Sequence, residues 1–184
     1  DRPLLLSYWG SLGAEVMDGY MADFIRAEQA AGAPFRHIHG AGRDFARLTQ
    51  ALAQSGTEDR PGSGLEIREY IYDMPLVMAA ADLVLCRSGA STVSELAAIA
   101  KPSVLVPSPN VTADHQTRNA RILSEAGGAV LLPEKECSGA KLYEVTYALL
   151  NDPARRADMS RKLSRLSTPD ANEKIYETLK ALLP

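Results

Sequence analysis

The chain has 184 residues, of which 46% are hydrophobic and 23% are charged, and its formal net charge is −3. This composition suits one globular domain, and the negative balance argues against a nucleic-acid partner, which usually needs a basic patch. No apolar run approaches the roughly 18 residues of a membrane span, and two isolated cysteines without zinc-ligand spacing favour a reducing compartment and predict no metal site.

Apolar and polar periodicity predicts strands and helices that alternate along the chain. Strands are expected over residues 4–6, 35–38, 65–71, 83–86, 103–106 and 129–132. Helices are expected over 16–25, 45–52, 92–100, 116–125, 140–150, 153–166 and 171–182, with a short one after Asp73. The last helix places Ile175, Leu179 and Leu182 on one stripe, which is usually core.

Strands separated by single helices predict an α/β fold with a Rossmann-like, parallel, six-stranded sheet and helices on both faces. In such sheets, ligands bind at the carboxyl ends of the strands, where helix N-termini also point. Polar clusters that directly follow strands are therefore the candidate site.

The first cluster, "SYWGSLGA", follows the first strand and contains Gly10, Ser11 and Gly13. The glycines allow close backbone approach, and a helix N-terminus can bind an anion. The cluster is neither G-x-G-x-x-G nor a P-loop with its lysine. An ordinary strand-to-helix turn explains it equally well.

The segment "CRSGASTVSE" joins the fourth strand to the next helix. Ser91 is a plausible N-cap, and Glu95 would then lie in the first helical turn, so capping explains both residues. Capping does not explain Arg87 at the end of a buried strand, whereas a bound diphosphate would.

Two further clusters follow the third and fifth strands. In "YIYDM", the backbone could hydrogen-bond a planar base, although a purely structural role is the simpler interpretation. In "NVTADHQTRN", Asp114 is a plausible N-cap, and Gln116 and Asn119 share a helix face, where amides suit sugar hydroxyls. His115 could be a general base, but a lone histidine at a helix start usually is not.

Together, the run "CRSGASTVSELAAIAKPSVLVPSPNVTADHQTRNA" resembles the donor-binding half of the MurG family, the bacterial peptidoglycan N-acetylglucosaminyltransferases of glycosyltransferase family 28. The resemblance implies that residues 1–184 are the C-terminal donor-binding domain of a two-domain GT-B enzyme. Such an enzyme transfers N-acetylglucosamine from UDP-N-acetylglucosamine to undecaprenyl-diphospho-muramoylpentapeptide, with inversion and without a tightly bound cofactor.

The N-terminal domain, absent here, would bind the lipid-linked acceptor, carry the catalytic base and associate with the cytoplasmic face of the plasma membrane. No catalytic residue is therefore expected in this chain, which should bind the donor weakly and catalyse nothing alone. In GT-B proteins the C-terminal helix often reaches back to the other domain, so part of the last helix could be exposed.

The resemblance also assigns site residues by position. Ser11 would contact the diphosphate, the Ile71 backbone would bind uracil, Glu95 would bind the ribose and Gln116 would bind the sugar hydroxyls. The other substrate-binding residues would be Arg87, Ala90, Ser91, Thr92, Val93 and Ser94. Possible further contacts are Gly10, Gly13, Met74, Ser88, Gly89, His115 and Asn119.

The sequence departs from the family at two positions in the first cluster. Trp9 replaces a usual glycine and could crowd the phosphates or wall the cleft, and Leu12 replaces a common polar residue. Three alternatives remain: a related GT-B enzyme with another lipid acceptor such as diacylglycerol, a non-catalytic subunit of a split transferase, and an α/β domain without a ligand.

Overall fold

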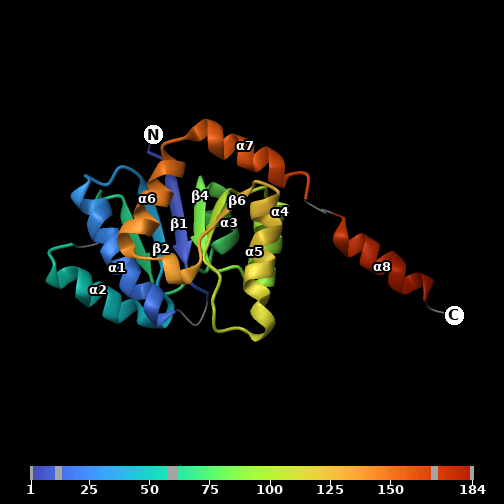
Figure 1. Cartoon of the computed structure of the whole chain (residues 1–184), viewed down its shortest axis with the longest axis horizontal. Coiled ribbons are helices and arrows are strands. Elements are labelled where there is room, and N and C mark those ends of the chain that lie inside the picture. The colour runs from blue at the N-terminus through green and yellow to red at the C-terminus, as the bar shows by residue number, and fades with distance from the viewer. Residues whose placement is uncertain (1, 11–13, 58–61, 167–169, 183–184) are drawn as a thin grey trace.

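The computed structural model describes residues 2–10, 14–57, 62–166 and 170–182. Its sheet has six strands in the order β3-β2-β1-β4-β5-β6, and every pairing is parallel. The strands are β1 (Leu4–Tyr8), β2 (Arg36–Gly40), β3 (Leu65–Arg68), β4 (Leu83–Cys86), β5 (Ser103–Leu105) and β6 (Ala129–Leu131). The predicted α/β fold with a parallel six-stranded sheet is confirmed (Figure 1).

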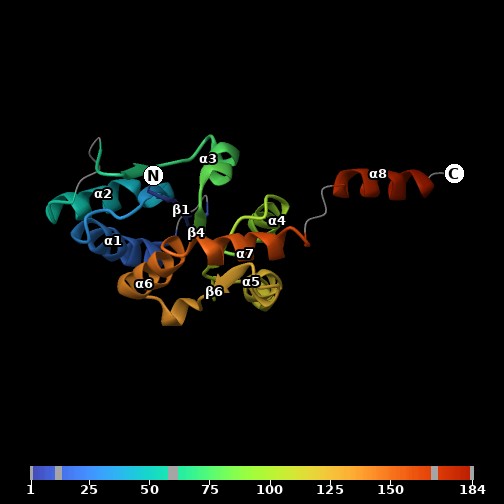
Figure 2. The ribbon, with the colours of Figure 1, turned by 90° about the horizontal axis from the view of Figure 1, so that it is seen from above.

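Helices cover both faces of the sheet (Figure 2). One apolar core lies beneath α1 (Glu15–Ala30), α2 (Phe45–Gln54) and α6 (Gly139–Leu150). The other lies beneath α3 (Met74–Ala80), α4 (Ala90–Ala98) and α5 (His115–Glu125). Neighbouring residues of β1 divide between the two cores, since Leu5 belongs to the first and Leu6 to the second, and both are fully buried. Strands buried on both faces read as continuous apolar runs, as observed here.

The last two helices differ in their packing. Helix α7 (Pro153–Leu163) crosses the edge of the sheet where the strands begin (Figure 1), with Met159 in one core and Leu163 in the other. Helix α8 (Ala171–Ala181) extends away from the body of the domain (Figures 1 and 2). Its stripe of Ile175, Leu179 and Leu182 is exposed and not core.

A polar network is buried between β1, β2 and α1. The Ser7 hydroxyl lies 2.7 Å from a ring nitrogen of His37 and 2.7 Å from one of His39, and the other ring nitrogen of His37 lies 2.7 Å from a Glu28 carboxylate oxygen. All four side chains are fully buried. Burial lowers the pKa of His39 to about 3, so this ring stays neutral in the core. Solvent cannot reach the network, so it is structural.

Several predicted boundaries were wrong. Strand β1 ends at Tyr8, two residues later than predicted. Strand β3 ends at Arg68 and not at residue 71, because the chain leaves the sheet before Tyr70. Helix α4 begins at Ala90 with Gly89 as its N-cap, so Ser91 is not the cap and Glu95 lies in the second turn. Helix α7 ends at Leu163, three residues earlier than predicted.

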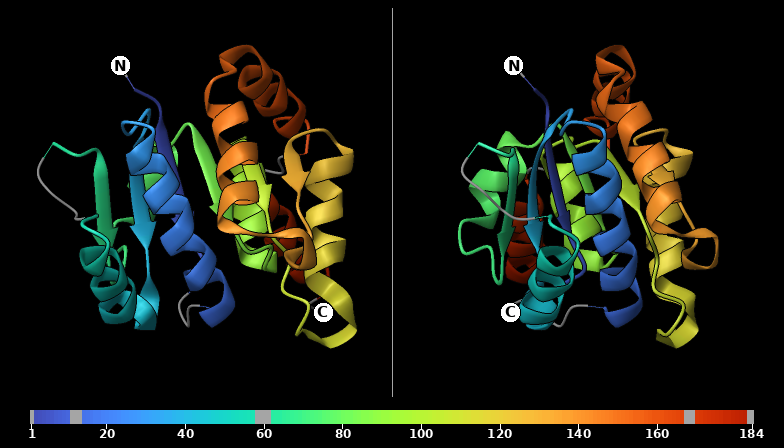
Figure 3. Two further views of the ribbon diagram at one scale, coloured as in Figure 1. Left: turned by 60° about the vertical axis from the view of Figure 1, so that its left-hand side comes forward. Right: turned by 90° about the vertical axis from the view of Figure 1, so that its left-hand side faces the viewer.

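The short 3-10 helices are η1 (Gly42–Asp44), η2 (Thr112–Asp114) and η3 (Glu134–Glu136), and each follows the end of a strand. Figure 3 shows that these connections and the N-termini of α1, α4 and α5 gather at one edge of the sheet. That edge is where the candidate site lies.

Candidate functional site

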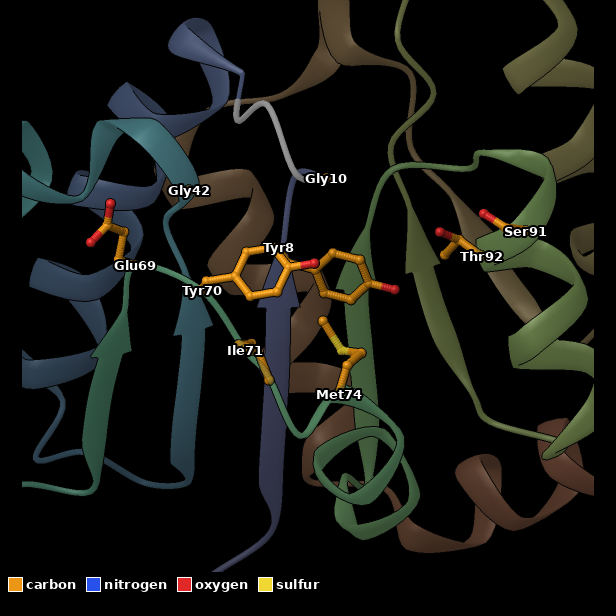
Figure 4. Close-up of a pocket in the computed structure, with 10 residues that line it drawn as sticks. Tyr8, Gly10, Gly42, Glu69, Tyr70, Ile71, Met74, Ser91 and Thr92 are labelled. Carbon is orange, nitrogen blue, oxygen red and sulfur yellow. The ribbon is translucent and has the colours of Figure 1, made fainter.

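A cavity of about 340 Å³ opens at the carboxyl edge of the sheet (Figure 4). It lies beside the point where the strand order reverses, because β1 pairs with β2 on one side and with β4 on the other. Open α/β sheets bind ligands at such switch points. The lining residues come from the ends of β1, β2 and β3, the start of α3 and the first turn of α4: Tyr8, Gly10, Gly40, Gly42, Glu69, Tyr70, Ile71, Met74, Ser91 and Thr92.

One wall of the cavity is formed by the connection between β3 and α3. The Ile71 side chain is buried, and a Cβ added at Gly40 would lie 3.1 Å from its Cδ1 atom, so the glycine allows the close approach of this connection to β2. Within the described part of the chain, the Ile71 N–H makes no hydrogen bond, and the Ile71 C=O begins the turn through Tyr72 and Asp73 while keeping a second lone pair. They remain available to a planar ligand with a donor and an acceptor on one edge.

The opposite wall is the N-terminus of α4. The first intrahelical hydrogen bond is donated by the Val93 N–H to the Gly89 carbonyl oxygen at 3.0 Å, so the N–H groups of Ala90, Ser91 and Thr92 precede the helical ladder. No side chain caps this end. Free N–H groups and the helix dipole favour an anion here, and the hydroxyls of Ser91 and Thr92 face the cavity in Figure 4.

Tyr8 lies at the centre of the cavity, between these two walls (Figure 4). Burial raises the pKa of Tyr8, as do the neighbouring Cys86 and Glu95, whereas side-chain hydrogen bonding with Thr92 lowers it by less. Burial also raises the pKa of Cys86 to about 12, so its thiol is not a nucleophile at neutral pH. The described lining of the cavity therefore offers hydrogen-bonding groups, and the buried Cys86 beside it is not an activated nucleophile.

Arg87 has a partner within the fold. Its guanidinium lies 2.5 Å from Glu134 of η3 and also donates to the Val106 carbonyl oxygen at 3.2 Å. Glu134 lines a second cavity, of about 310 Å³, between α1, the start of α5 and the end of β6. Arg87 was assigned to a phosphate from the sequence because its charge lacked a partner, and Glu134 is such a partner. That assignment therefore stays a prediction.

One predicted sugar contact, Gln116, and two possible donor contacts, Ser88 and Asn119, hold the α4 and α5 connections together. The Ser88 hydroxyl donates to the Gln116 carbonyl oxygen at 2.9 Å, and the Asn119 amide donates to the Ser88 carbonyl oxygen at 3.1 Å. The Gln116 side-chain oxygen accepts from the Ser108 N–H at 2.9 Å. These bonds fix the entrance of α5 relative to α4, while His115 is exposed and interacts with the Thr112 carbonyl oxygen at 3.0 Å.

The structure brings only part of the predicted set together. Gly10, Ile71, Met74, Ser91 and Thr92 line the first cavity. Ala90, Ser94 and Glu95 are exposed on α4 outside the lining, and Gly89 is its N-cap. Val93 faces the core, so only its backbone could contact a ligand. Ser11, Leu12 and Gly13 lie outside the described residues.

Trp9 neither crowds nor lines the cavity. It is buried in the core beneath α1 and α6. The sequence interpretation missed Tyr8, because the predicted strand ended at Leu6. Extending the alternation Leu4, Leu6, Tyr8 would have placed the tyrosine on the cavity side of β1.

The described residues contain no group of three or more His, Cys, Asp or Glu side chains that could hold a metal ion. Among the helices of the described chain, none is both long and apolar enough to cross a membrane.

The reversed strand order, the cavity beside it and the uncapped helix N-terminus define the class: an α/β domain of the kind that binds nucleotides at its switch point. A family model, the glycosyltransferase family 28 C-terminal domain, matches residues 8–175, and the chain belongs to this family.

Curated proteins with similar sequences support this family assignment. A UDP-N-acetylglucosamine–N-acetylmuramyl-(pentapeptide) pyrophosphoryl-undecaprenol N-acetylglucosamine transferase from Acetivibrio thermocellus is 38% identical over 100% of this chain and 48% of its own length. A transferase of the same name from Shewanella sp. (strain ANA-3) is 40% identical, over 99% of this chain and 49% of its own length. The chain spans about half the length of these curated relatives.

Solved structures show the same fold. The crystal structure of Acinetobacter baumannii MurG matches with a TM-score of 0.82 at 27% identity, over 98% of this chain and 50% of that one. The C-terminal CMP-Kdo binding domain of WaaA from Acinetobacter baumannii matches with a TM-score of 0.63 at 9% identity, over 89% of this chain and 88% of that one. The second likeness concerns the fold alone.

Proposed function

We propose that this chain binds UDP-N-acetylglucosamine as the donor domain of an inverting glycosyltransferase. The whole enzyme would transfer N-acetylglucosamine to undecaprenyl-diphospho-muramoylpentapeptide in peptidoglycan biosynthesis. The observation that carries the proposal is the first cavity, which sets the Ile71 backbone opposite the uncapped N-terminus of α4 in a chain of glycosyltransferase family 28. The transferase names of these curated relatives support the donor and the acceptor.

The two walls suit the two ends of a uridine diphosphate. Uracil carries a donor and an acceptor on one edge, which match the Ile71 C=O and N–H. The diphosphate carries the negative charge that the N–H groups of Ala90, Ser91 and Thr92 attract. Between the two walls, the ribose would lie against Tyr8.

Catalysis in such an enzyme requires stabilisation of the leaving UDP. When the acceptor hydroxyl attacks the anomeric carbon, the bond to the diphosphate oxygen breaks and negative charge develops on the diphosphate. Preorganised N–H groups at α4 would stabilise that charge without reorganising. Ser11, Arg87 and Gln116 remain proposed ligands; Arg87 would have to leave Glu134 or bind the ligand while paired with it.

The donor domain would act with an acceptor domain that supplies the catalytic base and the contact with the cytoplasmic membrane face. We therefore propose that residues 1–184 form one C-terminal domain and are inactive alone. A subunit of a split transferase and a GT-B enzyme with another lipid acceptor are the alternatives, and both would bind a nucleotide sugar in the same cavity.

Isothermal titration calorimetry tests the proposal. The chain is titrated with UDP, UDP-N-acetylglucosamine, CDP and GDP. We expect the two uridine nucleotides to bind, and CDP and GDP to bind at least tenfold more weakly. Cytosine reverses the positions of the donor and the acceptor that face the Ile71 backbone, and guanine presents the same groups on a larger, bicyclic base. Equal or tighter binding of CDP or GDP would contradict the donor assignment.

The variant Glu95→Gln tests the ribose contact. Hydrogen bonds to charged groups contribute about 1.5–3 kcal/mol, so UDP affinity should fall about tenfold or more. Glu125→Gln, at the end of α5, is the matched control and should bind UDP as the unaltered chain does. An unchanged affinity in Glu95→Gln would remove Glu95 from the site.

A further inference from the structure

The rings of Tyr8 and Tyr70 lie side by side between the two walls in Figure 4, and the Tyr8 hydroxyl is the one of the two that points toward α4. Tyr8 ends β1, pairs in register with Cys86 of β4 and shares its face of the sheet with Leu6. The ring is therefore anchored by the two central strands, while the hydroxyl points toward the first turns of α4. A side chain held in this way is well placed to select a ligand.

The surroundings of the Tyr8 hydroxyl are polar on the α4 side. In Figure 4 the hydroxyls of Tyr8 and Thr92 lie in the same part of the cavity, and Glu95 follows Thr92 by three residues along α4, near enough to raise the pKa of Tyr8. Cys86, which pairs in register with Tyr8, is buried. Two hydroxyls and a carboxylate offer both donors and acceptors, which is what a diol requires.

We propose that Tyr8 is a specificity-determining residue that hydrogen-bonds one of the two ribose hydroxyls of the nucleotide, while Glu95 accepts from the other. The inference rests on the proposed function, because it needs a nucleoside diphosphate in the first cavity. It goes beyond the ribose contact assigned to Glu95 by naming a second residue: Tyr8 produces part of the preference of this chain for ribonucleoside over deoxyribonucleoside diphosphates.

The protonation state of Tyr8 supports this role. Burial raises the pKa of the phenol, and the nearby Glu95 and Cys86 raise it further, so the hydroxyl is protonated throughout the neutral range. It can therefore donate to a ribose oxygen or accept from a ribose hydroxyl without a change of charge. A phenol contact of this kind should not depend on pH between about 6 and 9.

The test measures the binding of three ligands, UDP, 2′-deoxy-UDP and 3′-deoxy-UDP, to three forms of the chain. The forms are the unaltered protein, Tyr8→Phe and the control Tyr147→Phe, whose ring lies on α6 and stacks on Tyr143 with centroids 5.5 Å apart. Tyr8→Phe removes only the hydroxyl and keeps the ring, which packs against the core beneath α3, α4 and α5. Circular dichroism and the melting temperature establish that each form is folded.

The expected result is a non-additive loss. The unaltered chain should bind at least one deoxy analogue about threefold to tenfold more weakly than UDP, the range of one net hydrogen bond. Tyr8→Phe should weaken the binding of UDP by a similar factor. For one of the two deoxy analogues, Tyr8→Phe should bind as tightly as the unaltered chain does, because the hydrogen bond is already lost. Tyr147→Phe should match the unaltered chain with all three ligands.

Three results would overturn the inference and leave the proposed function standing. The first is an unaltered chain that binds all three ligands equally, which can be measured even if Tyr8→Phe does not fold. The second is a Tyr8→Phe variant that binds UDP unchanged, and the third is a variant whose loss is additive with both analogues. By contrast, no binding of UDP by the unaltered chain overturns the proposed function itself.

Discussion

Asp18, near the start of α1, is a buried carboxylate whose neighbour is another acid. It is 3% exposed, and neither of its side-chain oxygens receives a hydrogen bond from a donor group in the described part of the chain. Burial raises the pKa of Asp18 to about 7, and the neighbouring Asp44 raises it further, whereas Arg47 acts in the opposite direction. Two neighbouring carboxylates repel each other, so the protonated form of one of them is favoured.

The stability of the chain should therefore depend on pH at this residue. The folded-state pKa exceeds the unfolded value of about 4, so the stability contributed by the protonated form is present below pH 4 and is lost as the pH rises to about 7. In urea unfolding, Asp18→Asn should abolish this fall between pH 5 and 7. Asp23→Asn, an exposed residue on the same helix, should retain it. Parallel curves for all three forms would contradict the prediction.

The partner of Arg87 could not be predicted from the sequence. A charge at the end of a buried strand needs a partner, and the sequence correctly indicated that need. The partner in the structure is Glu134, which lies beyond two further strands, β5 and β6, and two α-helices, α4 and α5. The buried contacts of Ser7 with His37 and His39 could not be predicted either, because pairing across strands depends on the sheet order.

At the scale of elements, much of the fold follows from the sequence. All six strands and the main helices of the described chain are in the predicted order, because buried parallel strands and amphipathic helices leave strong periodic signals. The start of α4 was misplaced because Ser91 is a better capping residue than Gly89 by propensity. This helix end has no capping side chain and faces the cavity. Residue preferences for capping fail here because the free N–H groups are needed for a ligand.

The packing of α6 on α1 depends on Gly139. A Cβ there would lie 2.4 Å from the Cβ of Asp23, 2.8 Å from the Tyr20 carbonyl oxygen and 2.9 Å from the Phe24 nitrogen. Because two of these atoms are backbone, the helices must separate to accept a side chain. Gly139→Ala should therefore destabilise the chain by about 1–3 kcal/mol, which lowers the melting temperature by roughly 2–12 °C.

The matched control for this substitution is Gly19→Ala. Gly19 lies within α1 on an exposed face, and nothing stands within 4 Å of a Cβ placed there. Alanine should stabilise the helix interior by about 0.5–1 kcal/mol. Calorimetric melting of both variants measures the two effects, and a Gly139→Ala variant that melts with or above the unaltered chain would contradict the packing argument.

At the scale of the whole molecule, α8 stands apart from the domain core. Its apolar side chains Ile175, Tyr176, Leu179 and Leu182 are between 58% and 75% exposed. A chain shortened to end at Leu166 should therefore melt within about 2 °C of the unaltered one and should bind UDP equally well. A melting temperature lowered by more than about 5 °C would show that α8 packs on the domain in solution.

The central claim is that a uridine diphosphate lies between the connection after β3 and the N-terminus of α4. The most direct test is the amide NMR spectrum of the chain titrated with UDP. The account predicts that saturation shifts the amides of residues 40–42, 69–74 and 90–95, while those of α7 and α8 stay in place. Shifts confined to other segments, or none at ligand concentrations that saturate binding by calorimetry, would contradict it.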